Sequence, residues 1–442
     1  MIRTATRRAV CAQRKKRVGA RGADPQMIRT ATRRAVSAAR MQRVRVHAAV
    51  PQAAIRSAWV GFPLLSVALT MTLSACSWFT SESNIAPPAE LVDIAQSARV
   101  DTVWSRDLGT GPGERYLKLD ASVADGAIYA SDRRGHVYAL EKATGDIRWD
   151  TKLKLNISAG VGVGDGLVLV GTSKGDLIAL TKDSGKKQWM ATLSSEILAR
   201  PAVDFGVVVA QTVDGKVSAL SVADGKPLWQ QERSEPALSL RGTSAPLATG
   251  GIVLTGFASG KLSAFQLKDG HMLWEIPVAE PHGRSEIERL VDVDVQPVVA
   301  GKHLYAAAYQ GKMLAFDLEN GRILWSRDVS TYTGLDADAS NIYVTDDKDT
   351  VMALDMNTGA TIWKQDQLHG RRLSAPTVSG DAIAVGDFEG YVHWLSRADG
   401  HFIARDRVSR SAILSKPVAD AATLYVYSQN GRLAAVRLRA QP

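Results

Sequence analysis

The chain has 442 residues and a formal net charge of +9, but that charge is unevenly placed. Residues 1–75 hold 15 Lys and Arg and one acidic residue, which leaves 39 basic and 44 acidic residues in the remainder. A mildly acidic body lacks the basic surface of a nucleic-acid-binding protein. The two cysteines, Cys11 and Cys76, leave none beyond residue 76, so a disulfide scaffold is excluded.

The first predicted element is a leader and signal peptide over residues 1–75, removed from the mature protein. MIRTATRRAV occurs at 1–10 and again at 27–36, which indicates an upstream duplication or a start site placed too early. Residues 58–76 (AWVGFPLLSVALTMTLSAC) then form an uncharged, largely apolar run. Such a run is shorter than the roughly 20 residues of a membrane-spanning helix. It ends in small residues, which is typical of a cleaved export signal.

The end of this run, Leu73-Ser74-Ala75-Cys76, resembles the lipobox of bacterial lipoprotein precursors. The resemblance implies that Cys76 is acylated and becomes the first residue of the mature protein. Ser77 stands where inner-membrane lipoproteins of proteobacteria carry Asp, which implies the outer membrane. Several acyl chains together anchor a protein firmly. Residues 76–98 contain Ser, Pro and acids, and we interpret them as a lipidated flexible tether.

A motif recurs about every forty residues through the predicted domain, residues 99–442. Its glycine slots, with Asp349 in one of them, are 40, 40, 45, 51, 38, 41 and 41 residues apart, and this period is typical of solenoids and propellers. Two incomplete copies of the motif, which lack the final tryptophan, begin at Gly390 and Gly431. The six full copies are GHVYALEKATGDIRW (135–149), GDLIALTKDSGKKQW (175–189), GKVSALSVADGKPLW (215–229), GKLSAFQLKDGHMLW (260–274), GKMLAFDLENGRILW (311–325) and DTVMALDMNTGATIW (349–363).

Each repeat predicts four short strands. In residues 374–408, apolar runs alternate with Ser-Gly-Asp, Phe-Glu-Gly and Ala-Asp-Gly turns, and helical spacing is absent. Eight such repeats predict an all-β fold, an eight-bladed β-propeller of four-stranded antiparallel blades. The chain ends before the eighth blade can form its fourth strand. Residues 99–109 (RVDTVWSRDLG) alternate like a strand, so we expect them to complete that blade and close the ring.

A tryptophan ends the fourth strand of most repeats. A large flat ring at one fixed site can wedge between adjacent blades and bury on the order of 200 Å². We therefore interpret these residues as structural rather than as a ligand-stacking surface. They are Trp104, Trp149, Trp189, Trp229, Trp274, Trp325 and Trp363.

Two consecutive connections between repeats are longer than the others. They contain QQERSEPALSLRGTSAP (230–246) and PVAEPHGRSEIERLVDVDVQP (277–297). Because both lead from an outer strand to the next inner strand, we expect them to emerge as neighbours on one face, where loops on a rigid scaffold carry function.

The contents of these connections allow two interpretations. In one, the leucines belong to core strands and the alternating acids simply face water. In the other, the residues form an exposed patch of apolar side chains, an arginine and acids that grips a protein. The candidate partner-binding residues are Leu238, Leu240, Arg241, Asp292 and Asp294.

The repeat resembles the PQQ-type propeller repeat, in which Ala-Leu is followed at fixed spacing by a Thr-Gly or Asp-Gly turn and Trp. This resemblance raises the possibility of a quinone-dependent dehydrogenase. Such enzymes need a calcium ion beside the quinone, and many have a cysteine pair over it, but this body has no cysteine and short insertions. We therefore expect no catalytic residue, cofactor or metal. A periplasmic ligand-binding propeller that uses the central channel remains an alternative.

The lipobox, the eight blades and the motifs SLRGTSAP and EIERLVDVDVQP together resemble the BamB family, lipoproteins of the outer-membrane β-barrel assembly machinery. The resemblance implies a non-enzymatic scaffold, lipid-anchored in the outer membrane and facing the periplasm. In that family, residues of these two motifs contact the POTRA domains of BamA. It also implies that the scaffold assists unfolded outer-membrane proteins.

Overall fold

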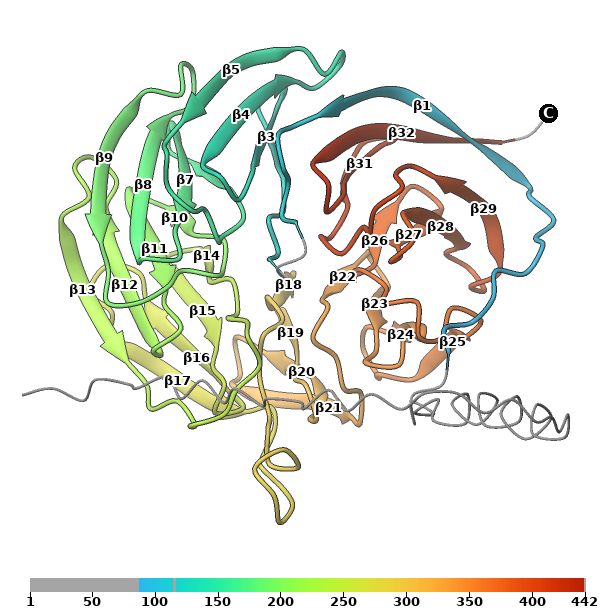
Figure 1. Cartoon of the computed structure of the whole chain (residues 1–442). Coiled ribbons are helices and arrows are strands. Elements are labelled where there is room, and N and C mark those ends of the chain that lie inside the picture. Colours follow the sequence, from blue (N-terminus) through green and yellow to red (C-terminus); the bar gives the residue numbers. More distant parts are fainter. Residues whose placement is uncertain (1–86, 114–116, 441–442) are drawn as a thin grey trace, which may run out of the picture. The chain divides into compact units, whose positions relative to one another are not determined.

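The computed structural model describes residues 87–113 and 117–440, and within them every regular element is a β-strand. Cys76 and the predicted signal peptide lie outside the described residues. The 32 strands form eight sheets of four antiparallel strands each. The blades follow one another around a ring, from β2–β5 in teal to β30–β32 in red (Figure 1). The predicted all-β, eight-bladed propeller is confirmed. No helix in the described part is long and apolar enough to cross a bilayer.

The blades share one pattern, with a three-residue inner strand in each. Blades 1 to 4 contain β2 (Ser122–Ala124), β3 (Ala127–Ser131), β4 (His136–Glu141), β5 (Ile147–Lys152), β6 (Gly162–Gly164), β7 (Leu167–Gly171), β8 (Asp176–Thr181), β9 (Lys187–Thr192), β10 (Ala202–Asp204), β11 (Val207–Gln211), β12 (Lys216–Ser221), β13 (Pro227–Glu232), β14 (Leu247–Thr249), β15 (Ile252–Gly256), β16 (Lys261–Gln266) and β17 (Met272–Pro277).

The second half of the ring repeats the arrangement. Blades 5 to 8 contain β18 (Val298–Ala300), β19 (His303–Ala307), β20 (Met313–Asp317), β21 (Arg322–Arg327), β22 (Leu335–Ala337), β23 (Asn341–Thr345), β24 (Val351–Asp355), β25 (Thr361–Gln365), β26 (Thr377–Ser379), β27 (Ala382–Gly386), β28 (Tyr391–Ser396), β29 (Phe402–Arg407), β30 (Val418–Asp420), β31 (Thr423–Tyr427), β32 (Arg432–Ala440) and, at its outer edge, β1 (Ala98–Asp107).

The ring closes through β1, as the sequence predicted. This strand pairs antiparallel with β32, from Ala98 opposite Ala440 to Asp107 opposite Arg432, with a register shift between Thr102 and Trp104. The N-terminal strand therefore supplies the fourth strand of a blade that the C-terminus begins. Joining the two ends of the described chain in one sheet covers an edge that would otherwise be open to other strands.

The core lies in the two middle strands of each blade. All five residues of β7 (LVLVG) are buried, because neighbouring blades cover both faces of the sheet. In the outer strand of the same blade, β9, only Trp189 is fully buried. This difference explains why the middle strands appear in the sequence as continuous apolar runs.

The indole rings cross the seams between blades. Trp189 donates from Nε1 to the Val222 carbonyl oxygen at 2.8 Å, and its ring lies on Gly225, where a Cβ would come within 2.6 Å of the ring. The glycine of each turn is thus needed both for its positive φ and for this close approach. The same hydrogen bond and glycine contact occur at Trp104, Trp149, Trp229, Trp325 and Trp363.

Trp274 departs from this arrangement. Within residues 87–113 and 117–440, its indole has no hydrogen-bond partner, and a Cβ at Gly321 of the next blade would meet nothing within 4 Å. Its ring instead lies 4.8 Å from the ring of Phe316, centroid to centroid. The seam between blades 4 and 5 is therefore packed differently from the other tryptophan seams.

The described end of the predicted tether is bound to the propeller. Ala89 donates its N–H to the His369 carbonyl at 2.8 Å, and its own carbonyl accepts from the buried Arg371 at 2.9 Å. Arg405 donates to the carbonyl of Val92 at 2.8 Å. Ala89 and Val92, in the described part of the predicted tether, are thus hydrogen-bonded to blades 6 and 7.

Candidate functional site

The two long connections emerge side by side from the ring. The first joins β13 to β14 across residues 233–246, and the second joins β17 to β18 across residues 278–297. Both run from an outer strand to the next inner strand, so they lie on the face opposite the tryptophan turns. The second projects beyond the ring (Figure 1). We call them the first and second connectors.

The first connector exposes an apolar and a cationic side chain. Leu238 is 42% exposed, and Leu240 is half-buried. Arg241 is exposed and forms an ion pair of 3.1 Å with Glu196, which belongs to the preceding inter-blade connection. The sequence left open whether these residues are buried in core strands or exposed as a patch. Leu238 and Arg241 are exposed. A cavity of about 300 Å³ lies beneath this connector.

The second connector has two parts. Its tip, residues 280–289, is exposed, and Ile287 reaches 71% exposure. The following segment, Val291 to Val295, is buried. There Tyr309 donates its N–H to the Asp292 carbonyl at 2.7 Å, which brings the segment into the wall between blades 4 and 5.

The placement of the acidic pair corrects the expectation from sequence. Asp292 and Asp294 are only 2% and 7% exposed, so they neither face water nor extend an exposed patch. Alternation suggested one wet face, but both faces of this segment are covered. Val291 and Val293 pack into the core cluster between blades 4 and 5, and Val295 packs into the cluster between blades 5 and 6. The Asp294 carboxyl group lies against Gly242 of the first connector.

The acids support the first connector from below. A Cβ at Gly242 would lie 2.0 Å from an Asp294 carboxyl oxygen, so a larger residue would have to displace this buried carboxyl group or the loop. The backbone of Leu240 acts on the Asp292 carboxyl group in the direction that lowers its pKa, which places this part of the first connector against that acid. Sequence reasoning missed Gly242. The available signal was a glycine inside SLRGTSAP, outside any repeated turn.

Burial makes this acidic cluster unusual electrostatically. Burial raises the pKa of Glu235 to about 7, and it raises the pKa values of Asp292 and Asp294 as well. The neighbouring charge of Asp294 raises the pKa of Asp292 further. One carboxyl oxygen of each of the three residues lacks a hydrogen-bond partner.

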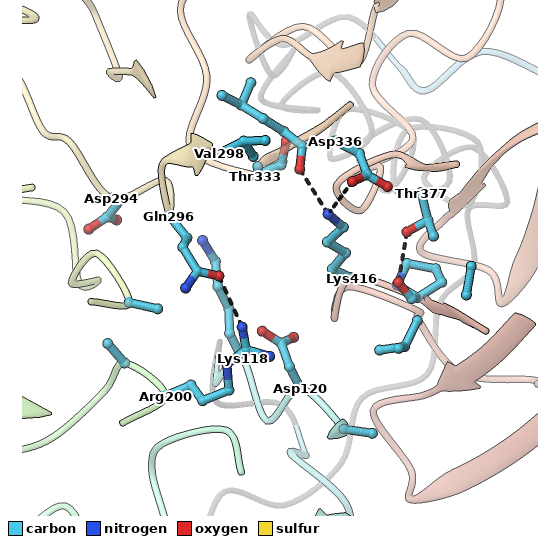
Figure 2. A pocket seen from close by; sticks show the side chains of 18 of the residues that line it. Lys118, Asp120, Arg200, Asp294, Gln296, Val298, Thr333, Asp336, Thr377 and Lys416 are labelled. Carbon is cyan, nitrogen blue, oxygen red and sulfur yellow. Dashed lines mark hydrogen bonds and ion pairs between the residues drawn. The ribbon is translucent and has the colours of Figure 1, made fainter. Parts of the chain in front are cut away.

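The central channel is lined by polar side chains, several of which pair with one another. Its lumen has a volume of about 570 Å³ (Figure 2). Arg200 donates to Gln296 at 3.0 Å, and Lys416 lies 3.3 Å from Asp336. Within the described residues no group of three or more His, Cys, Asp or Glu side chains is arranged to hold a metal ion. The lumen adjoins the connector site, because Thr243 of the first connector and Asp294 of the second also line it.

Comparison with known proteins identifies the family. The family model described as outer membrane protein assembly factor BamB matches residues 92–157 and 133–365. The chain belongs to the BamB family. The outer membrane protein assembly factor BamB of Pseudomonas aeruginosa is 45% identical over 373 residues, which cover 84% of this chain and 98% of that relative.

Solved structures agree with this assignment. The crystal structure of BamB from Moraxella catarrhalis matches with a TM-score of 0.71 at 29% identity, covering 77% of this chain and all of that one. A quinohemoprotein alcohol dehydrogenase from Comamonas testosteroni matches with a TM-score of 0.63, but at 12% identity. The second match shows a shared fold alone. The resemblance to the BamB family is confirmed, and its relatives are named as assembly factors rather than enzymes.

Proposed function

We propose that this chain is a non-enzymatic scaffold of the outer-membrane β-barrel assembly machinery that docks the POTRA domains of BamA. In this proposal, lipid on Cys76 holds the propeller at the periplasmic face of the outer membrane. Membership of the BamB family supports the role in assembly. The geometry of the connectors supports docking over ligand binding in the channel.

The observation that carries this proposal is an exposed Leu-Arg pair on a rigidly supported loop. Leu238 is exposed, and Arg241 is oriented by Glu196 at 3.1 Å. Beneath them, Gly242 lies directly on Asp294. A loop already held in its binding conformation loses less entropy when a partner docks. An exposed apolar anchor beside an arginine is typical of residues that dominate protein interfaces.

The structure suggests different roles for the five candidate residues. Leu238 and Arg241 are accessible and would contact the partner, with Leu240 at the border of the contact. Asp292 and Asp294 are buried and would position the first connector from below. We therefore propose that the acids act through the loop and do not touch BamA.

Unfolded outer-membrane proteins are the second proposed partner. Among the described residues, the outer strands β17 and β21 each pair with a strand on one side only, and both carry paired exposed apolar residues. Met272 and Leu273 on β17, and Ile323 and Leu324 on β21, are each more than 40% exposed. An extended substrate chain adding to such an edge would gain backbone hydrogen bonds and apolar contacts.

The docking proposal is tested with the purified chain and the purified periplasmic part of BamA. The variant Leu238→Ala/Arg241→Ala should weaken binding at least about 10-fold while the melting temperature and circular dichroism stay unchanged. The matched control is Ile147→Ala, because Ile147 is 50% exposed on the outer strand of blade 1. Unchanged affinity in the double variant would reject docking through the first connector.

The anchoring proposal has a separate test. Cys76→Ala should release the chain from the outer membrane into the periplasmic fraction, because the protein would lose its acyl chains. Fractionation of cells measures this directly. Persistent association of the variant with membranes that lack BamA would contradict anchoring by lipid.

A further inference from the structure

A second cavity opens on the same face, where the connectors meet the end of the channel. Its volume is about 370 Å³. We call it the basin. Its apolar wall comes from Leu117, Leu240, Tyr309, Tyr332, Leu373 and Leu414. These residues come from six different connections and turns around the ring, so the basin exists only because the ring closes.

Contacts between its lining residues hold the wall of the basin in place. Tyr309 and Tyr332 meet edge to face, with ring centroids 6.0 Å apart and planes at 70°. Lys118 holds the connection that carries Tyr332 by donating to its carbonyl at 2.7 Å. Leu373 is buried in the wall, whereas Leu414 is half-buried and Tyr332 is 36% exposed. A fixed apolar wall that stays open to solvent is typical of a binding site.

The charges around the basin are mostly positive. Lys118, Arg241 and Arg372 line it and are exposed, whereas its one acidic residue, Asp294, is buried. Arg241 is also ion-paired with Glu196, which lies outside the lining. The Lys118 hydrogen bond is made to a neutral carbonyl, so it does not cancel the lysine charge.

We propose that the basin receives one large apolar side chain of the docked protein partner, presented beside a carboxylate that meets the surrounding cations. This inference rests on the proposed function and deepens it. Leu240 and Arg241 belong both to the first connector and to the basin lining, so the docking surface continues into the basin. An apolar wall beside cations favours such a pair over a polar or cationic segment.

Cross-linking tests the placement of the partner. Leu414 lies on the connection between β29 and β30, which is far in the chain from the first connector and belongs to other blades. Leu414→p-benzoyl-phenylalanine should therefore cross-link the periplasmic part of BamA on irradiation. The same substitution at Ile147, on the outer edge of blade 1, should give no cross-link. Cross-linking of an unfolded outer-membrane protein in place of BamA would overturn the inference.

Filling the basin provides the second test, in the binding assay described above. Leu414→Trp should weaken BamA binding about 10-fold, because the added ring occupies the space that the partner needs. Arg372→Gln should weaken it about 3-fold and Arg372→Lys should restore it, since the charge contributes. Melting temperatures show whether each variant remains folded.

The outcomes separate this inference from the docking proposal. If Leu238→Ala/Arg241→Ala weakens binding but Leu414→Trp does not and Leu414 gives no cross-link, the basin stays empty and only this inference fails. If neither the connector variant nor the basin variant weakens binding, both proposals fail.

Discussion

The tryptophan seams and the long connectors lie at opposite ends of the same strands. They differ in whether their residues repeat from blade to blade. At a seam, each residue repeats at fixed spacing because each must fit the next blade in the same way, as Trp189 fits Gly225. At the connectors, nothing repeats, and buried acids support an exposed leucine and arginine. The residues that repeat in every blade thus serve the packing of blades. The residues that depart from the repeat, in the connectors, serve the proposed docking of a partner.

The seam between blades 4 and 5 lies between these two cases. Trp274 keeps its place in the sequence repeat, but its ring packs on Phe316 and leaves Gly321 open. The second connector leaves from the outer strand of the same blade. The regular packing is therefore interrupted in the blade from which the second connector leaves, at the opposite end of its outer strand.

Removing one seam tryptophan should have the largest effect. Trp189→Ala should lower the free energy of unfolding by about 3–5 kcal/mol, because Trp189 is 7% exposed and its loss leaves a cavity. Trp274→Ala should cost at least about 1 kcal/mol less, since no indole hydrogen bond to the next blade is lost. Urea unfolding measures both. Equal losses would show that the two seams do not differ.

A single methyl group at Gly242 tests the connectors. Gly242→Ala should weaken BamA binding at least about 10-fold, because its Cβ would collide with Asp294 and displace the loop. Ser239→Ala, on the exposed part of the same connector, is the matched control and should bind normally. Normal binding by Gly242→Ala would mean that the acids do not position the first connector.

Acidity provides the smallest of the three effects. The pKa of Glu235 is raised to about 7 by burial, so the folded protein keeps a proton that the unfolded chain has lost. This stabilisation is complete below the unfolded pKa of about 4.3 and is lost as pH rises toward 7. Glu235→Gln should therefore be more stable than the wild type by about 1 kcal/mol at pH 8, a value discounted for partial exposure.

The comparison at low pH is the control for this prediction. At pH 4 the stability advantage of Glu235→Gln over the wild type should have largely disappeared. Urea unfolding of both proteins across pH 4 to 8 checks it. A constant difference between the two proteins over this range would contradict a raised pKa.

Much of the fold could be predicted because each sequence repeat corresponds to one blade. Eight glycine slots and their tryptophans predicted eight blades, and a missing last strand predicted closure by β1. The exception at Trp274 could not be predicted, because Trp274, Phe316 and Gly321 all match the repeat. Trp229, Phe265 and Gly270 match it in the same way, and there the hydrogen bond and the glycine contact are kept.

The sequence predicted where the connectors lie, but it did not predict which of their residues are buried. Their extra length was visible, and so were Leu238 and Arg241. The burial of Asp292 and Asp294 was not, because alternating acids normally indicate a strand with one wet face. Here a second loop covers that face, and a contact between residues fifty positions apart leaves only Gly242 as its trace in the sequence.

Hydrogen exchange of the chain with and without the periplasmic part of BamA tests the central claim most directly. We predict that binding protects residues 236–241 of the first connector and the rim of the basin, while the turns that carry the seam glycines stay unchanged. Protection confined to the tryptophan face, with none in the first connector, would contradict the account.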